Sequence, residues 1–250
     1  MRLTFLGTGG AGGVPRYGCQ CSACDAARKN AERIRRPCSA LVESGNTRLL
    51  LDAGLMDLHE RFAPGSLSAM LLTHFHPDHV QGLLHLRWGK GARIPVICPP
   101  DPEGFADLYK HPGLLAFSFC EPLCTFTVSE LKMTPLPLNH SRLTLGYAIE
   151  TSKGQRLAYL TDTLGLPQVT LLFLQCWGEF DLVLDCSFPP GSKGRNHNDL
   201  DQAMALAKLS KARTTYLTHL GHELDGWLEQ AAPLPNNIKI ARDGWSVLLK

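Results

Sequence analysis

Short apolar runs alternate with longer amphipathic stretches along almost the whole chain. Runs rich in Leu, Ile, Val, Tyr and Thr predict strands, and apolar positions that recur every three or four residues predict helices between them. Because strands and helices interleave instead of forming separate blocks, the pattern favours an α/β fold. The predicted strands are residues 2–6, 39–43, 48–53, 69–73, 94–98, 125–128, 144–150, 156–162, 182–185, 214–218 and 245–249. The predicted helices are residues 79–88, 103–109, 168–176, 200–210 and 223–231, with Asp199 as the N-cap of the fourth.

Length and composition suit one large globular unit. The 250 residues are 44% hydrophobic, enough for a sizeable core, and contain no internal repeat or linker-like segment, so we expect one domain over residues 1–250. The formal net charge of +2 gives no broad basic field, so we expect no stable nucleic-acid partner. No apolar stretch reaches membrane-spanning length and residues 1–7 lead into a glycine loop, so we expect a cytoplasmic protein with no membrane partner.

A cluster of potential metal ligands follows the apolar run at residues 68–73. Within six positions it holds His74, His76, Asp78 and His79. Side chains alternate along a strand, so His74 and His76 should point to one side, while Asp78 and His79 reach a second position across the turn. Imidazole and carboxylate are ligands that zinc, manganese and iron share. The spacing predicts a dinuclear metal site, against the alternative of a solvated histidine-rich turn.

Three further potential ligands stand at the ends of other apolar segments. His140 ends a proline-stiffened stretch, Asp162 ends a predicted strand, and His219 follows another. Open α/β sheets place their sites at the carboxyl ends of strands, so these side chains are expected to join the cluster. The glycine-rich loop at residues 7–13 lacks the lysine of a phosphate-binding loop, and we interpret it as a turn that approaches the site closely.

Together these motifs resemble the metallo-β-lactamase superfamily. The resemblance implies a four-layered αβ/βα sandwich with metals at one edge, between two mixed sheets. It also implies two catalytic divalent ions, Mn²⁺ or Zn²⁺, bridged by Asp162. With an aspartate at this position, the chain resembles the hydrolase and phosphodiesterase branch of the superfamily, because di-zinc β-lactamases commonly carry a cysteine as a second-metal ligand. The implied ligand sets are His74, His76 and His140 for one ion, and Asp78, His79 and His219 for the other.

Within that branch the chain resembles the cyclic ribose phosphate phosphodiesterases of phosphonate catabolism. The likeness implies hydrolysis of 5-phospho-α-D-ribosyl 1,2-cyclic phosphate to ribose 1,5-bisphosphate by a homodimer, with 2′,3′-cyclic nucleotides as side substrates. The ribonuclease Z family is similar in core motifs, but no insertion here resembles its long arm for gripping tRNA. The segments that carry the likeness are residues 7–11, 19–24, 80–83, 111–115, 135–141 and 195–197.

The nine cysteines are of two kinds. Six are scattered through apolar or mixed segments, and the odd total indicates free thiols in a reducing compartment. Cys19, Cys21 and Cys24 instead form a C-x-C-x-x-C knuckle before a helical stretch, within a Cys-rich segment at about residues 17–38. Three thiolates can converge on a structural Zn²⁺, and one disulfide with a spare thiol is the alternative. His222 is the candidate fourth ligand, and the resemblance implies the same assignment.

The expected chemistry needs no side-chain nucleophile, because two neighbouring dications activate water and neutralise charge on a phosphoryl oxygen. We expect His197 and Asp78 to be catalytic residues, Asp78 as a metal ligand. The resemblance implies that His197 lies beside the leaving group and protonates it. Asp52 is expected to orient a ligand histidine, with similar supporting roles for Asp185 and Ser187.

The sequence therefore predicts a metal-dependent phosphodiesterase, a phosphoric diester hydrolase acting on a small cyclic phosphodiester. Two alternatives stay open: another hydrolase of the same superfamily, such as a thioesterase or lactonase, and an RNA-processing, ribonuclease Z-like enzyme. A non-catalytic nucleic-acid-binding relative is disfavoured, because every ligand position is filled and the charge is near balance.

Overall fold

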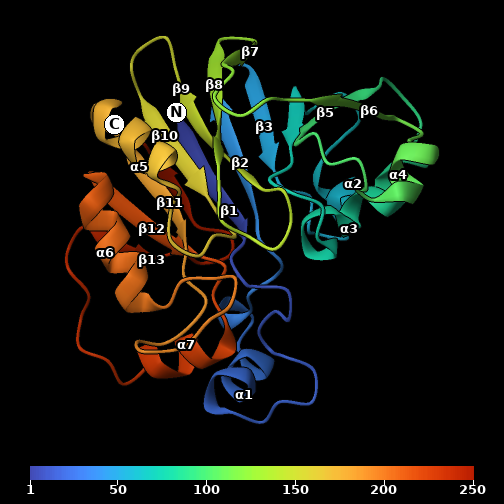
Figure 1. The fold of residues 1–250 in the computed structure, drawn as a ribbon. Helices are drawn as coiled ribbons and strands as arrows, with labels where there is room; N and C mark the ends of the chain where they lie inside the picture. Colours follow the sequence, from blue (N-terminus) through green and yellow to red (C-terminus); the bar gives the residue numbers. More distant parts are fainter.

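The computed structural model describes residues 1–250 and contains two mixed, seven-stranded β-sheets packed face to face (Figure 1). The first sheet has the order β14 (Ser246–Leu248), β1 (Arg2–Gly7), β2 (Ser39–Ser44), β3 (Thr47–Leu51), β4 (Ala69–Leu71), β5 (Ile94–Cys98) and β6 (Leu115–Phe119). The second sheet has the order β13 (Ile238–Ile240), β12 (Thr214–Thr218), β11 (Asp181–Asp185), β10 (Arg156–Leu160), β9 (Leu145–Glu150), β8 (Leu131–Pro137) and β7 (Phe126–Val128).

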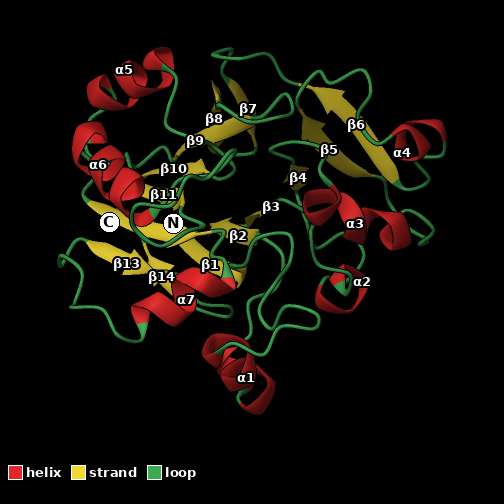
Figure 2. Ribbon diagram, turned by 60° about the horizontal axis from the view of Figure 1, so that its bottom comes forward, coloured by secondary structure: helices red, strands yellow, loops and turns green.

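Helices cover the outer face of each sheet (Figure 2). Apolar residues of α2, α3 and α4 pack on the first sheet, and those of α5, α6 and α7 pack on the second. The helix α1 lies beside α7 at one end of the molecule. The helices are α1 (Ser22–Lys29), α2 (Leu58–Arg61), α3 (Pro77–Leu86), α4 (Ala106–Lys110), α5 (Gln168–Cys176), α6 (Leu200–Ser210) and α7 (His222–Leu228), with a 3₁₀ turn at Ala31–Arg33.

Three large apolar clusters hold the four layers together, one in each space between neighbouring layers. Leu49 and Leu51 of β3 point into the cluster between the two sheets, whereas Leu50 points under the helices of the first sheet. On β10, Tyr159 lies between the sheets and Leu160 under the helices of the second sheet. Both faces of these strands are buried, which explains their continuous apolar sequences. The αβ/βα sandwich expected from the sequence is confirmed.

Most element predictions agree with the structure within a few residues. The bounds predicted for α5 and α6 are those observed, and Asp199 caps α6: its side chain accepts from the Gln202 backbone N–H while the Gln202 side chain accepts from the Asp199 backbone N–H. None of the helices combines the length and apolar character needed to cross a membrane.

Three strands, β6, β8 and β13, and the one-turn helix α2 were not predicted from the sequence. In β8, Pro135 and Pro137 argue against a strand, because proline cannot donate a ladder hydrogen bond. The pairing explains how they are accommodated. On one side β7 pairs with β8 only as far as Met133, so both prolines lie beyond the end of β7. The carbonyl of Pro135 faces this side, where it accepts from the Leu123 backbone N–H at 2.8 Å, so the nitrogen without a proton faces away from β9.

Candidate metal centre

The carboxyl ends of several parallel strands meet at one edge between the sheets. β3 runs parallel to β4 in the first sheet, and β10, β11 and β12 run parallel in the second. Asp52, Asp162 and His219 follow three of these strands and have left-handed backbone φ angles of 57°, 61° and 60°. Such angles are uncommon outside glycine and concentrate at functional sites. They turn the chain sharply at the strand ends and leave the side chains inside the site.

The first ligand group consists of His74, His76 and His140, with Asp162 beside them. His76 Nδ1 lies 2.8 Å from His74 Nε2 and 3.0 Å from His140 Nε2. One imidazole nitrogen carries either one proton or one lone pair, so His76 Nδ1 cannot satisfy both neighbours by hydrogen bonding. Three nitrogens gathered in this way are arranged as ligands around a cation.

The second ligand group consists of Asp78, His79 and His219. Asp78 Oδ2 lies 3.4 Å from His79 Nε2 and 3.7 Å from His219 Nε2. Asp162 stands between the groups: its Oδ2 is 3.1 Å from His79 Nε2, and its Oδ1 is 3.4 Å from His219 Nε2 and 3.7 Å from His140 Nε2. The structure therefore brings together all seven residues that the sequence analysis grouped, with Asp162 at the centre.

The donor atoms fit divalent metal ions better than they fit a hydrogen-bond network. Both ring nitrogens of His79 and Nε2 of His219 are buried and have no hydrogen bond of normal geometry, although carboxylate oxygens lie nearby. Buried polar atoms are normally paired, so unpaired imidazole nitrogens that face carboxylates need another explanation. Imidazole and carboxylate together form the donor set of zinc and manganese sites. The fit supports a metal centre formed by these residues.

Burial and charge act in opposite directions on the site histidines. Burial lowers the pKa of His74 well below its ordinary value, which favours the neutral ring that a ligand requires. Burial would also lower the pKa of His79, but the carboxylates of Asp162 and Asp52 outweigh it and raise that pKa well above the ordinary range. Against its own burial, His219 has its pKa raised to about 9 by Asp162 and Asp78. The site thus attracts positive charge at its centre.

Neighbouring polar groups fix the ligand rings from behind. Asp52 Oδ2 lies 2.9 Å from His79 Nδ1, a charge contact without hydrogen-bond geometry, in the place where the sequence analysis expected a supporting aspartate. Ser187 Oγ lies 2.9 Å from His219 Nδ1, and the carbonyl of Asn196 accepts from His140 Nδ1 at 3.3 Å. Each contact leaves the Nε2 atom of the ring facing the ligand group, which is how protein sites commonly orient metal-binding histidines.

His197 lies beside the ligand groups without belonging to either trio. Its Nδ1 is 2.6 Å from Asp185 Oδ2, and its ring stacks on His219 with centroids 4.5 Å apart. The His197 side chain is 20% exposed, so solvent and small molecules can reach it. The glycine loop also approaches the site as predicted, because a Cβ atom at Gly10 would lie 3.0 Å from His219 Cε1.

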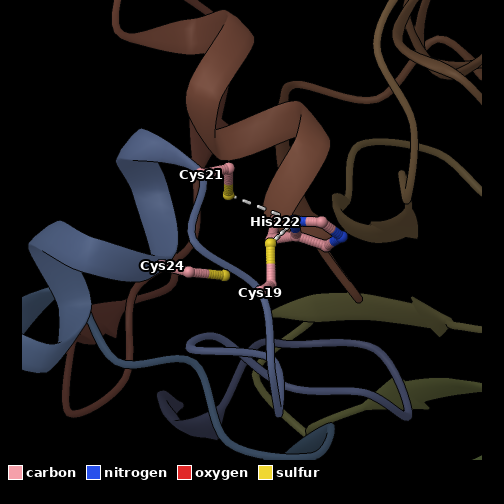
Figure 3. Close-up of side chains that lie close together, drawn as sticks. All are labelled: Cys19, Cys21, Cys24 and His222. Atoms are coloured by element: carbon pink, nitrogen blue, oxygen red, sulfur yellow. Dashed lines mark hydrogen bonds between the residues drawn. The ribbon is translucent and has the colours of Figure 1, made fainter.

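The cysteine knuckle forms a second cluster, whose cysteines lie far from these ligands in the sequence, but whose histidine follows His219 by three residues. Figure 3 shows the sulfurs of Cys19, Cys21 and Cys24 converging on the imidazole of His222, the first residue of α7. His222 Nδ1 lies 3.5 Å from Cys19 Sγ and 3.3 Å from Cys21 Sγ. All nine cysteines are free thiols. Burial raises the pKa of Cys24 to about 11, so a thiolate there needs a nearby cation.

Comparison with known proteins identifies the family. A family model described as the β-lactamase superfamily domain matches residues 47–220, which include all seven residues at the centre and His197. The chain belongs to the β-lactamase superfamily. Its two-sheet architecture is the metallo-β-lactamase sandwich predicted from the sequence.

Individual proteins that resemble this chain carry different names. Among solved structures, a diphosphatase from the PhnP family is 27% identical, with a TM-score of 0.81, over 99% of this chain and 97% of that chain. An octanoyltransferase of Porphyromonas gingivalis is 27% identical over 263 residues, which cover all of this chain and 52% of that protein. Coenzyme PQQ synthesis protein B of Methylorubrum extorquens is 29% identical over 201 residues, 67% of each chain. The chain thus spans about half the length of the first of these two curated relatives.

Proposed function

We propose that this protein is a metal-dependent phosphodiesterase. The observation that carries the proposal is the place of Asp162, whose two carboxylate oxygens face the two histidine groups from the centre of the site. A shared carboxylate of this kind suits two divalent ions, Mn²⁺ or Zn²⁺. His74, His76 and His140 would hold one ion, and Asp78, His79 and His219 the other. When bound, such a pair of ions polarises phosphoryl oxygens and activates water.

The knuckle would hold a third ion with a different purpose. Its three thiols and one imidazole make a closed set of four donors, which is the usual composition of a structural Zn²⁺ site. No donor position is left for a substrate. The proposed Zn²⁺ would therefore fix the segment around α1 to the start of α7, three residues after His219.

His197 is the proposed general acid. Its Nδ1 proton is donated to Asp185, which holds the ring in one orientation and leaves Nε2 to present a proton to the leaving oxygen. Asp185 Oδ2 also accepts from the backbone N–H of Thr163 at 3.0 Å, so the carboxylate is itself held in place. Asp78, as a ligand beside His219, is the second residue assigned to catalysis.

We propose 5-phospho-α-D-ribosyl 1,2-cyclic phosphate as the substrate and ribose 1,5-bisphosphate as the product, in phosphonate catabolism, with 2′,3′-cyclic nucleotides as side substrates. The sequence motifs and the diphosphatase of the PhnP family support this choice. A cytoplasmic homodimer with no membrane or stable nucleic-acid partner completes the proposal.

A substrate panel tests the proposal against its alternatives. The purified protein, with its metal content measured, would be given the ribosyl cyclic phosphate, a 2′,3′-cyclic nucleotide, an S-acyl glutathione, a homoserine lactone and a precursor tRNA. We expect the ribosyl cyclic phosphate to have the highest kcat/KM and to lose its turnover after metal removal. Faster turnover of the thioester, the lactone or the tRNA would replace the proposed function with the corresponding class.

A further inference from the structure

Thr73, the residue immediately before His74, lies between the side chains of Asp52 and His74. The threonine is fully buried. Its Oγ1 atom lies 3.0 Å from each carboxylate oxygen of Asp52 and 3.0 Å from Nδ1 of His74. The backbone N–H of Thr73 also donates to Asp52 Oδ1 at 2.8 Å. The hydroxyl therefore connects a buried carboxylate with a histidine of the first ligand group.

The single proton of the hydroxyl fixes the direction of this chain of hydrogen bonds. A carboxylate only accepts, so Thr73 donates its hydroxyl proton to Asp52. Having no second proton, Thr73 can only accept from His74, and His74 must therefore carry its proton on Nδ1. The lone pair of His74 is then on Nε2, the atom that lies 2.8 Å from His76 Nδ1 within the ligand group.

Asp52 reaches the other ligand group without an intermediary. Its second oxygen lies 2.9 Å from Nδ1 of His79, whose Nε2 faces Asp162 at 3.1 Å. One buried carboxylate thus lies against one histidine in each group, through a close charge contact with His79 and through the threonine hydroxyl for His74. Both rings and the carboxylate are fully buried, so water does not compete for these contacts.

We propose that Thr73 is a positioning residue, which relays the orienting effect of Asp52 to His74 and so links the two metal groups through one carboxylate. The inference rests on the proposed metal centre. Under this proposal the role of Thr73 depends on its hydroxyl group and not on the shape of its side chain. Partners of this kind usually contribute 10- to 100-fold to metal affinity or activity.

Three substitutions separate the hydroxyl from the shape of the side chain. Thr73→Val replaces the hydroxyl by a methyl group, and Thr73→Ser keeps the hydroxyl. Thr215→Val is the matched control, because Thr215 is also fully buried on a strand but its hydroxyl has no hydrogen-bond partner. The readouts are the metal content per chain after dialysis, the rate of metal loss to a chelator, and the melting temperature of the metal-loaded protein.

We expect Thr73→Val to bind Zn²⁺ at the centre about 10- to 100-fold more weakly than the wild type, with faster loss to the chelator. Thr73→Ser should restore most of the affinity, and Thr215→Val should leave it unchanged. Adding Asp52→Asn to Thr73→Val should weaken binding less than the product of the two single effects, because the residues act in one chain. Wild-type affinity in Thr73→Val, or no rescue by Thr73→Ser, overturns the relay.

Two further outcomes keep the relay distinct from the proposed function. Wild-type protein that binds no ion beyond the one held by the knuckle overturns the metal centre, and the relay with it. If Thr73→Val does not fold, imidazole ¹⁵N NMR of the Zn²⁺-loaded wild type decides the question. A proton on Nδ1 of His74 supports the relay, and a proton on Nε2 overturns it.

Discussion

Asp162 and His219 stand at the ends of β10 and β12 with nearly the same left-handed backbone conformation, and Asp162 Oδ1 lies 3.4 Å from His219 Nε2. A left-handed conformation in a residue other than glycine costs of order 1–3 kcal/mol, and such strain persists where the surroundings enforce it. The surroundings do so here, because both residues are buried between the two sheets. Asp162 is consequently held at the point where the two ligand groups meet.

Asp162→Ala should reduce turnover by roughly 10³-fold or more, because the carboxylate shared by both ligand groups is lost and each metal contributes several kcal/mol to the transition state. Steady-state hydrolysis of the ribosyl cyclic phosphate measures the effect, with metal content measured in parallel. Asp57→Ala serves as the control for removal of a surface carboxylate, because Asp57 lies just before α2, where it pairs with Arg61 and is 40% exposed. A folded Asp162→Ala protein with near wild-type turnover would contradict the shared position of this residue.

Cys21→Ser should remove about one zinc per chain and destabilise the protein more than it changes chemistry in the folded fraction. A structural zinc contributes folding free energy, and a loss of about 3 kcal/mol would lower the Tm by roughly 6–12 °C. Metal counting and thermal melting check the expectation. Cys176→Ser is the control, because Cys176 is an exposed free cysteine at the end of α5. Unchanged zinc content and Tm in Cys21→Ser would rule out the structural ion.

His197→Ala should slow substrates with alkoxide-like leaving groups by about 10² to 10⁴, the usual contribution of a positioned acid. A nitrophenolate leaves without needing a proton, so the same variant should hydrolyse an aryl phosphodiester at close to the wild-type rate. The ratio of the two effects is the measurement. If both substrates slow equally, His197 instead positions a phosphate or supports His219, on which its ring stacks.

The ligand residues could be predicted from sequence because their spacing is local or follows a strand. His74 to His79 occupy six consecutive positions, and Asp162 and His219 end apolar runs whose carboxyl ends must meet at one edge of a parallel sheet. The cysteine knuckle is equally compact, and its fourth member, His222, was found by its position after His219. That these groups bind metal remains a prediction.

The features that escaped prediction depend on contacts between distant parts of the chain. Nothing in the sequence near Thr73 indicates that its hydroxyl meets Asp52, which lies 21 positions earlier. The threonine looks like an ordinary end of a strand, although its place directly before the first ligand histidine is a usable signal. The Asn196 contact is a backbone carbonyl, which has no side-chain signature at all. Strand β8 was not predicted because its prolines argue against a strand. The structure accommodates them because β7 is shorter than β9 and ends before the prolines.

Asp101 and Arg142 form an ion pair that connects two loops near the site. Asp101 Oδ2 accepts from Arg142 Nη2 at 2.9 Å, and Arg142 also donates to the carbonyl of Phe75, between His74 and His76. Burial would raise the pKa of Asp101, but the backbone N–H of Gly104 and the Arg142 guanidinium outweigh burial and lower it. A carboxyl whose pKa is lowered in the folded protein stabilises the fold above the pKa of the unfolded chain, about 3.9.

Asp101→Asn should therefore reduce the free energy of unfolding by about 1.5–3 kcal/mol at pH 7, the range for a hydrogen bond to a charged group. The difference between wild type and variant should shrink as the pH falls through the lowered pKa of Asp101, because protonation removes the same charge from the wild type. Urea unfolding at pH 7 and at two values below pH 4 measures it. Glu103→Gln removes an exposed carboxylate from the same turn and should show no such trend. A difference that stays constant with pH would mean that Asp101 acts through its shape and neutral hydrogen bonds, not through its charge beside Arg142.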